Sequence, residues 1–98
     1  MVIVFRSVAT ATIDEDISLT ITKPAGVVSG DVLVVVLSFV PDGSPPVVTY
    51  PAGWVEVRKD GVTDVEIVQA CARKVAGGAE PAVYTFTWDT PSDCVGAI

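Results

Sequence analysis

Hydrophobic and polar residues alternate strictly in two segments of this chain. Ile17, Leu19 and Ile21 are separated by Ser and Thr, and in residues 83–88 three aromatic residues alternate with Val and Thr. A hydrophobic period of two residues is typical of a β-strand that buries one face and exposes the other. The pattern therefore predicts half-buried strands over residues 17–22 and 83–88.

A third segment is apolar at every position. Residues 32–37 have the sequence Val-Leu-Val-Val-Val-Leu and lie close to turn-forming residues. An uninterrupted apolar run of this length predicts a strand buried on both faces. Because exposed apolar strands tend to aggregate, we expect this strand in the middle of a sheet. Residues 1–5 form a shorter apolar stretch, which predicts an edge or packing strand.

The middle of the chain predicts shorter strands joined by turns. Residues 47–50 and 54–58 are strand candidates, and Asp60-Gly61 is a dipeptide typical of a β-hairpin turn. Residues 64–75 have apolar positions on both faces, which either a bulge or a short helix would explain.

Composition favours an all-β domain. The chain has 20 Val, 9 Thr and 6 Ile, which favour strands, but only 3 Leu, so long amphipathic helices lack their usual residues. The segments amount to about eight strands with turn signals between them, a spacing typical of β-sandwiches. We expect residues 1–98 to form one all-β domain, a jelly-roll-like β-sandwich.

Charge and missing residue types exclude several function classes. The net charge of −6 provides no basic stripe for a phosphate backbone, so we expect no nucleic acid partner. The apolar run Val32–Val40 is shorter than the ~20 residues of a membrane helix, so we expect no membrane partner. The chain has no His, the commonest general base and a frequent zinc ligand. We therefore expect no enzyme, no catalytic residue, no cofactor and no metal.

Two cysteines, Cys71 and Cys94, are too few for a disulfide framework and have no CxxC spacing. Two small buried thiols are the favoured interpretation, and a disulfide between them is the alternative.

Acidic residues allow two further interpretations. Asp14, Glu15 and Asp16 are consecutive and offer oxygen ligands for calcium, but without EF-hand spacing a solvated turn is the favoured interpretation. Glu56 and Glu66 are one formal choice for a glycosidase carboxylate pair, although nothing in the sequence singles them out.

Three residues are candidates for binding at an exposed surface. Asp42 and Ser44 lie in the turn-rich segment 41–46, which predicts an outward loop. Trp54 follows Pro-Ala-Gly and is the aromatic residue that we expect to be most exposed. Exposed aromatic rings stack on sugars, so a carbohydrate-binding β-sandwich module is an alternative function.

Several short motifs follow one another in a characteristic order. They are Thr22-Lys-Pro-Ala-Gly26, Ser29-Gly-Asp-Val-Leu33, Pro51-Ala-Gly-Trp54, Arg73-Lys-Val-Ala76, Glu80-Pro81 and Tyr84-Thr-Phe-Thr-Trp88. In order and spacing the set resembles a domain of structural proteins of tailed bacteriophages and prophages, found in tail-fibre, baseplate or head-associated proteins. The resemblance covers roughly residues 17–98.

The resemblance implies a non-enzymatic protein located in the virion, of the tail, fibre or head-decoration type. Its implied partners are other virion proteins or copies of itself, as a homo-oligomer, with a host-surface glycan as a further partner. It implies architectural roles for the motif residues: Gly30-Asp31 forms the turn into the apolar strand, and Pro51 and Gly53 direct Trp54.

The resemblance also raises a question about the end of the domain. Similar proteins continue beyond the Gly-Ala-Ile segment with which this sequence ends. The expectation is that the domain is either truncated or completed by a strand of a neighbouring chain. A secreted bacterial adhesion domain is a third interpretation, which the lack of a signal peptide disfavours.

Overall fold

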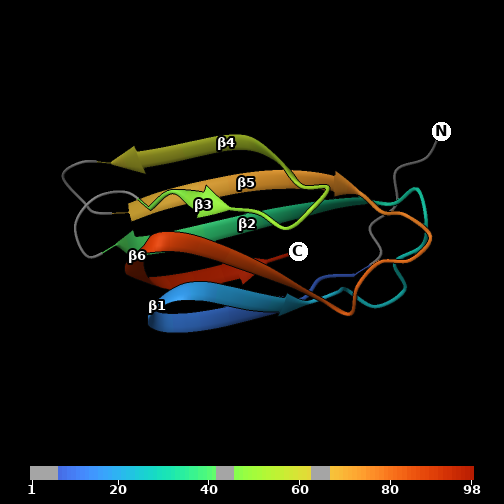
Figure 1. Ribbon diagram of the computed structural model, residues 1–98, viewed down its shortest axis with the longest axis horizontal. Helices are drawn as coiled ribbons and strands as arrows, with labels where there is room; N and C mark the ends of the chain where they lie inside the picture. The colour runs from blue at the N-terminus through green and yellow to red at the C-terminus, as the bar shows by residue number, and fades with distance from the viewer. Residues whose placement is uncertain (1–6, 42–45, 63–66) are drawn as a thin grey trace.

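The computed structural model describes residues 7–41, 46–62 and 67–98, and these form strands and turns without any helix. Six antiparallel strands belong to one hydrogen-bonded sheet with the order β1-β6-β2-β5-β4, and β3 pairs with β6 (Figure 1). The strands are β1 (Thr10–Thr22), β2 (Val32–Pro41), β3 (Val48–Thr49), β4 (Val55–Val62), β5 (Ile67–Val75) and β6 (Val83–Ala97).

The sheet folds back on itself because β1 and β6 both bend. The two strands pair along their length, from Thr10 opposite Ala97 to Thr22 opposite Val83, with irregular register between Ile13 and Ser18. Glu15 has a φ of 45° at the bend of β1, a conformation uncommon outside glycine. Figure 1 shows the two halves of β6 as separate runs that cross the molecule in opposite directions.

The bends divide the sheet into two arms. The short arm contains β3, residues 18–22 of β1 and residues 83–88 of β6. The long arm contains residues 10–13 of β1, residues 92–97 of β6, and then β2, β5 and β4.

The hydrophobic core lies between the two arms. The short arm contributes Leu19, Ile21, Tyr84, Phe86 and Trp88, and the long arm contributes Leu33, Val35, Leu37, Phe39, Val68, Ala70, Ala72 and Cys94. The ring centroids of Phe39 and Trp88 are 4.8 Å apart in an edge-to-face arrangement, which aromatic pairs prefer.

The turn before β2 is formed by Gly30 and Asp31. Gly30 has a φ of 93°. The Asp31 amide donates to the Val28 carbonyl at 3.1 Å, and the Asp31 carboxylate accepts from the Val28 amide at 3.0 Å. An Asp that bonds its own backbone in this way stabilises a tight turn.

The all-β prediction is confirmed, and the described ranges form six strands, where the sequence predicts about eight over the whole chain. The predicted turn at Asp14–Asp16 and the turn-like segment Thr90–Asp93 are bends inside β1 and β6, so the strands predicted at residues 17–22 and 83–88 extend beyond them. The predicted strand at residues 1–5 and most of the predicted loop 41–46 lie outside the described residues.

Strand β2 has the predicted position but not the predicted burial. It lies between β5 and β6, so the expectation of a central strand is confirmed. Leu33, Val35 and Leu37 are buried, whereas Val34 is 47% exposed, so the prediction of burial on both faces is wrong. The reason is that only one arm covers β2, and its other face is the outside of the folded sheet.

The hairpin of β4 and β5 exists, but it does not turn at Asp60-Gly61. These two residues continue β4, opposite Gln69 and Val68, and the connection falls outside the described residues. The mixed apolar register after residue 64 reflects neither a helix nor a bulge in β5; the bulge interrupts β4 between Glu56 and Arg58.

Both cysteines are free thiols. Cys94 is buried in the core, and this burial raises the pKa of its thiol to about 12. Cys71 is only half-buried, because it faces outward from β5, so the prediction of two buried thiols holds for one of them. Over the described ranges, no helix is long and apolar enough to cross a membrane.

Candidate interaction surface

The outer face of the long arm is unusually apolar. It carries large aliphatic side chains from three neighbouring strands, between 36% and 62% exposed. We call it the valine face and define it by Val32, Val34, Val36, Val40, Ile67, Val75 and Val95. Soluble monomers rarely leave a contiguous apolar patch larger than a few hundred Å² in water.

The strand register makes this surface continuous. Val36 of β2 lies opposite Cys71 on one side and Ala97 on the other, and Val32 lies opposite Val75. Side chains directly opposite each other in an antiparallel sheet are about 5 Å apart, close enough for contact. The central strand of the long arm therefore supplies an aliphatic row that the flanking strands widen, interrupted at Ser38, which lies opposite Gln69 and Val95.

The outer face of the short arm has a different chemistry. Its exposed positions are mostly Thr, with the single valine Val83 opposite Thr22, and the Oγ1 atoms of Thr20 and Thr85 are 2.9 Å apart across the β1–β6 pair. The remaining members are Ser18, Thr22, Thr49 and Thr87. Thr and Val have similar shapes and both favour strands. Strand propensity alone therefore does not account for valine on the long arm.

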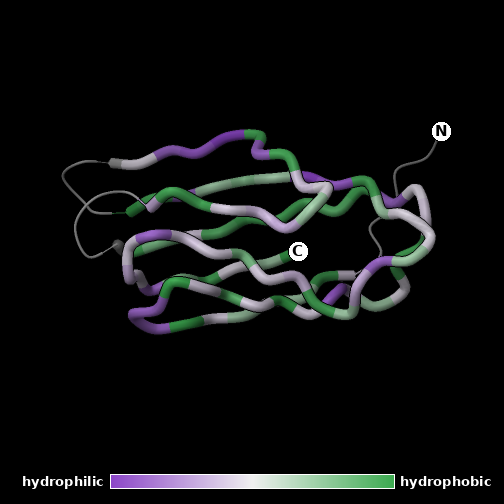
Figure 2. Tube along the Cα trace, viewed as in Figure 1, coloured by the Kyte–Doolittle hydropathy of each residue, from purple (hydrophilic) through white to green (hydrophobic). Residues whose placement is uncertain are grey.

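Charged residues on the valine face balance one another. On β4, the Arg58 Nε atom is 2.6 Å from the Asp60 Oδ2 atom, with both side chains exposed. Arg73 of β5 and Asp93 of β6 are exposed as well, opposite Val34 and Val40. Figure 2 shows β4 as the most hydrophilic strand of this arm. Among the described residues, the face therefore combines its aliphatic side chains with two positive charges, two negative charges and the polar pair Ser38 and Gln69.

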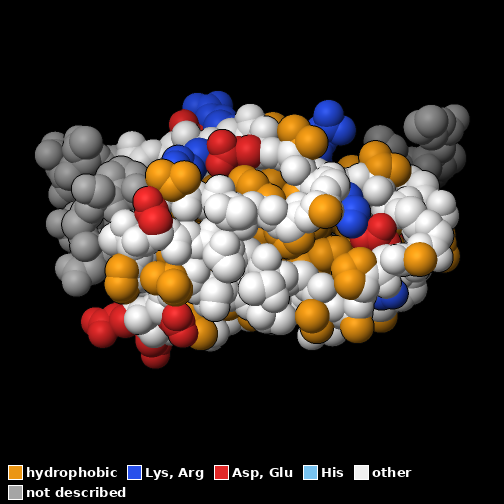
Figure 3. All heavy atoms as spheres, in the orientation of Figure 1, with side chains coloured by type: hydrophobic (Ala, Val, Ile, Leu, Met, Phe, Trp, Pro, Cys, Tyr) orange, Lys and Arg blue, Asp and Glu red, His pale blue; other side chains and the backbone are white. Residues whose placement is uncertain are grey.

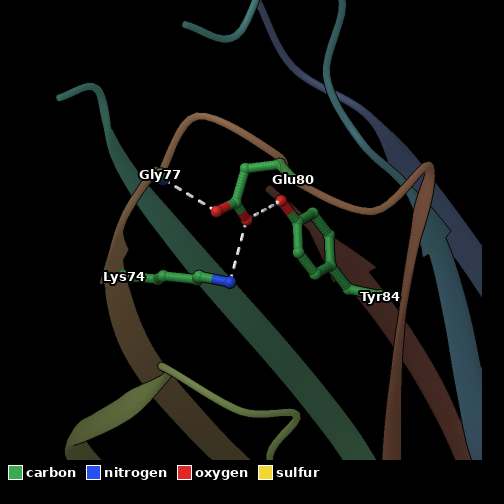
Figure 4. A network of polar contacts seen from close by, with 4 residues as sticks. All are labelled: Lys74, Gly77, Glu80 and Tyr84. Atoms are coloured by element: carbon green, nitrogen blue, oxygen red, sulfur yellow. Dashed lines mark hydrogen bonds and ion pairs between the residues drawn. The ribbon is translucent and has the colours of Figure 1, made fainter. Parts of the chain in front are cut away.

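The strongest polar cluster lies at the other side of the long arm, beneath the β5–β6 connection. Lys74 Nζ is 2.8 Å from Glu80 Oε1, Tyr84 donates its hydroxyl to the same oxygen at 2.7 Å, and the Gly77 amide donates to Oε2 at 2.8 Å (Figure 4). The side chains of Lys74 and Glu80 are only 15% and 8% exposed.

These contacts shift the acidity of both partners. The hydrogen bond from Lys74, followed by those from Gly77 and Tyr84, lowers the pKa of Glu80 from 4.5 to about 2. Burial, followed by the hydrogen bond to Glu80, raises the pKa of Tyr84 well above its ordinary value. Every oxygen of the carboxylate has a partner, so the cluster fixes the β5–β6 connection in place.

Trp54 is buried, so the expectation of an exposed ring is wrong. The ring is 8% exposed and packs edge-to-face against Tyr84 and Phe86, with centroids 5.4 and 5.5 Å away. The turn formed by Pro51 and Gly53, in which the Trp54 amide donates to the Pro51 carbonyl, directs the ring into the core. Trp54 thus has no open ring face for stacking on a sugar.

The two buried indoles differ in their hydrogen bonding. Trp88 donates its Nε1–H to the Asp16 carbonyl at 2.8 Å. The Nε1 atom of Trp54 has no hydrogen-bond partner. The other predicted binding residues, Asp42 and Ser44, lie outside the described residues, so the structure does not place them beside Trp54.

The acidic residues singled out in the sequence serve local structure. Asp14, Glu15 and Asp16 lie at the bend of β1, and Figure 3 shows acidic side chains gathered at that end of the molecule. The Asp16 carboxylate accepts from the Ile17 amide at 2.7 Å. Glu56 accepts from the Tyr50 hydroxyl at 2.9 Å. Its proposed partner Glu66 lies outside the described residues.

In the described part of the chain, no group of three His, Cys, Asp or Glu side chains is arranged to hold a metal ion. Comparison with protein-family models, with curated proteins and with solved structures finds no match for this chain. The valine face is therefore the feature that carries the functional argument. Sequence reasoning missed it because the same apolar run is compatible with a strand buried on both faces.

Proposed function

We propose that this chain is a non-enzymatic structural protein of a tailed-bacteriophage particle, of the tail, fibre or head-decoration type. It acts through protein–protein contacts and is located in the virion. The observation that carries the proposal is the valine face, a broad aliphatic surface on a rigid sheet. Such a surface is suited to packing against another protein and offers little chemistry for catalysis.

We further propose that the folded sheet is a β-sandwich of jelly-roll type, with the short and long arms as its two layers. The support is the core between the arms, where Phe39 of β2 meets Trp88 of β6. Bends in β1 and β6 let single strands contribute to both layers, as strands do at the corners of sandwiches. A module of this kind can be used at many positions of a particle.

The polar cluster supports a structural rather than a catalytic protein. Lys74, Glu80 and Tyr84 bond one another, and the Glu80 carboxylate is held ionised by its partners. A general acid or base works best with a pKa near the operating pH, and Glu80 is shifted away from it. The motif order described above supports the phage assignment.

The test is to locate the protein in particles. Tailed particles are purified from the strain that encodes the chain, separated on a density gradient and probed with an antibody against the 98-residue protein. We expect the protein to co-sediment with intact particles and to resist a high-salt wash. Particles that lack the protein, with the protein found only in the free fractions, contradict the proposal.

A further inference from the structure

We infer that the valine face binds the valine face of a second copy of this chain, so that two long arms pack face to face. The inference names the partner of the surface described above, and its biological setting rests on the proposed function. Three observations support a second copy as the occupant: the size of the face, its charge and its symmetry.

The long arm has the size of a stable interface. The 10 residues of β2 span roughly 33 Å at about 3.3 Å per residue, and the three strands that carry the valine face, spaced about 4.8 Å apart, are roughly 14 Å wide. The flat area of the valine face is on the order of 500 Å², and the corrugated accessible area is larger. Specific interfaces bury about 800 Å² per partner. The valine face together with the flanking strands β1 and β4 therefore reaches the size of a stable interface.

The charge of the face favours self-association. The whole chain carries a net charge of −6, so two copies repel each other at most orientations. Arg58 and Arg73 balance Asp60 and Asp93 on this face. A neutral face with both signs is compatible with a copy of itself, whereas a surface built for a basic partner would be acidic.

The strand order gives the face a natural twofold arrangement. β2 is the middle strand of the five-stranded long arm, with β6 and β1 on one side and β5 and β4 on the other. A twofold axis that lies midway between the two copies, parallel to the sheets and over the centre of β2, places the valine row of one copy against that of the other, as an isologous interface requires. Sheets that pack in this way lie about 10 Å apart, and their side chains interdigitate.

The outer face of the short arm can be compared with the valine face within the same domain. Its outer face, which we call the threonine face, has the same pleated, β-branched surface, but its exposed side chains are mostly Thr, as in Thr20, Thr85 and Thr87, with Val83 as its one valine. Antiparallel sheets commonly expose such a polar face to water. The contrast within one small domain indicates that the valine face, and not the threonine face, is covered in the assembled state.

The experiment compares two matched carboxylate substitutions in the 98-residue protein. Val34→Glu places a negative charge in the valine face opposite Arg73, which the sheet tolerates because opposite charges pair across strands. Thr87→Glu makes the same change in net charge on the threonine face. Size-exclusion chromatography with light scattering gives the mass of each, and circular dichroism confirms that each is folded.

At micromolar concentration we expect the wild-type protein and Thr87→Glu to have twice the mass of the 10.2 kDa chain, and Val34→Glu to be a monomer. A monomeric wild-type protein overturns the inference, as does a Val34→Glu variant that stays dimeric. Equal dissociation by both variants also overturns it, because net charge rather than the face would then control the mass.

The two cysteines add an independent readout. Cys71 lies on the outer face opposite Val36, whereas Cys94 is buried in the core. We expect alkylation of Cys71 to slow several-fold as the wild-type concentration rises, and to be fast at all concentrations in Val34→Glu. Cys94 reacts only after unfolding and is the internal control. A Cys71 rate independent of concentration overturns the inference.

This result is separable from that of the particle test. A monomer that is nevertheless found in purified particles overturns self-association and leaves the structural role, with another virion protein as the occupant of the face. A dimer that is absent from particles supports self-association and contradicts the structural role in the virion.

Discussion

The two arms of the sheet approach each other closely at Gly96. A Cβ atom at this position would lie 2.8 Å from Leu19 Cδ2, 2.8 Å from Leu37 Cδ2 and 2.9 Å from Ile21 Cδ1. All three atoms belong to buried side chains of the core. Glycine at this position is therefore required by the distance between the arms and not by backbone conformation.

We expect Gly96→Ala to lower the free energy of unfolding by about 1–3 kcal/mol, because an extra methyl group overpacks the core and forces three buried side chains to shift. Gly78→Ala is the matched control, since a Cβ at Gly78 meets nothing within 4 Å. That control should change stability by less than about 0.5 kcal/mol. Urea denaturation followed by tryptophan fluorescence measures both. Equal effects of the two substitutions would mean that the arms are further apart than the structure places them.

The burial of Trp54 could not be predicted from the sequence. The Pro-Ala-Gly turn before Trp54 was predictable, but the burial of Trp54 depends on Tyr84 and Phe86 from a strand far along the chain. Local pattern does not encode which distant ring covers a side chain. The same is true of the unpartnered Trp54 Nε1 atom, which only the packed core reveals.

At the scale of elements, the ion pair of Lys74 and Glu80 links the end of β5 to the start of β6. The pKa of Glu80 is about 2 in the folded protein, against an ordinary value of 4.5. Because the folded-state pKa is lower, the folded protein binds fewer protons than the unfolded chain, and the carboxylate stabilises the fold above pH 4.5. This stabilisation is lost as the pH falls from about 4.5 towards 2.

We therefore expect the free energy of unfolding of the wild-type protein to fall steeply over this pH range. Glu80→Gln should be less stable at pH 7 by about 3 kcal/mol, because Lys74 loses its partner in a mostly buried site. The variant should also have a shallower decline in acid, with a residual slope from other carboxylates such as Asp89, whose pKa is also lowered. Urea titrations at a series of pH values test this, and parallel curves for the two proteins would contradict it.

Strands in which hydrophobic and polar residues alternate were predictable from the sequence, but the way in which they continue through the bends was not. Residues 17–22 and 83–88 form strand segments as their alternation predicts. These strands extend through the bends because distant residues pair, such as Thr10 with Ala97. The turn-like residues at the bends make the sequence look as if each strand ended there. The valine face was hidden for a related reason. The sequence of β2 does not indicate whether its valines at positions 32, 34, 36 and 40 are covered by another layer of the protein or exposed.

At the scale of the whole molecule, the first and last described strands pair with each other along both arms. β1 and β6 each belong to the short arm and to the long arm, so the backbone of one arm continues directly into the other. Each arm also supplies one side of the same core. Two arms that share strands and a core should unfold together, in a single cooperative transition.

The two tryptophans allow this cooperativity to be tested, because they contact different parts of the core. Trp88 packs on Phe39 of the long arm, and Trp54 packs on Tyr84 and Phe86 of the short arm. In Trp54→Phe the fluorescence reports on Trp88, and in Trp88→Phe it reports on Trp54. For each variant, kept dilute enough to be monomeric, we expect the urea midpoints from fluorescence and from far-ultraviolet circular dichroism to coincide. Midpoints that separate in either variant would show that one arm opens while the other persists, which contradicts the single transition expected of arms that share β1 and β6.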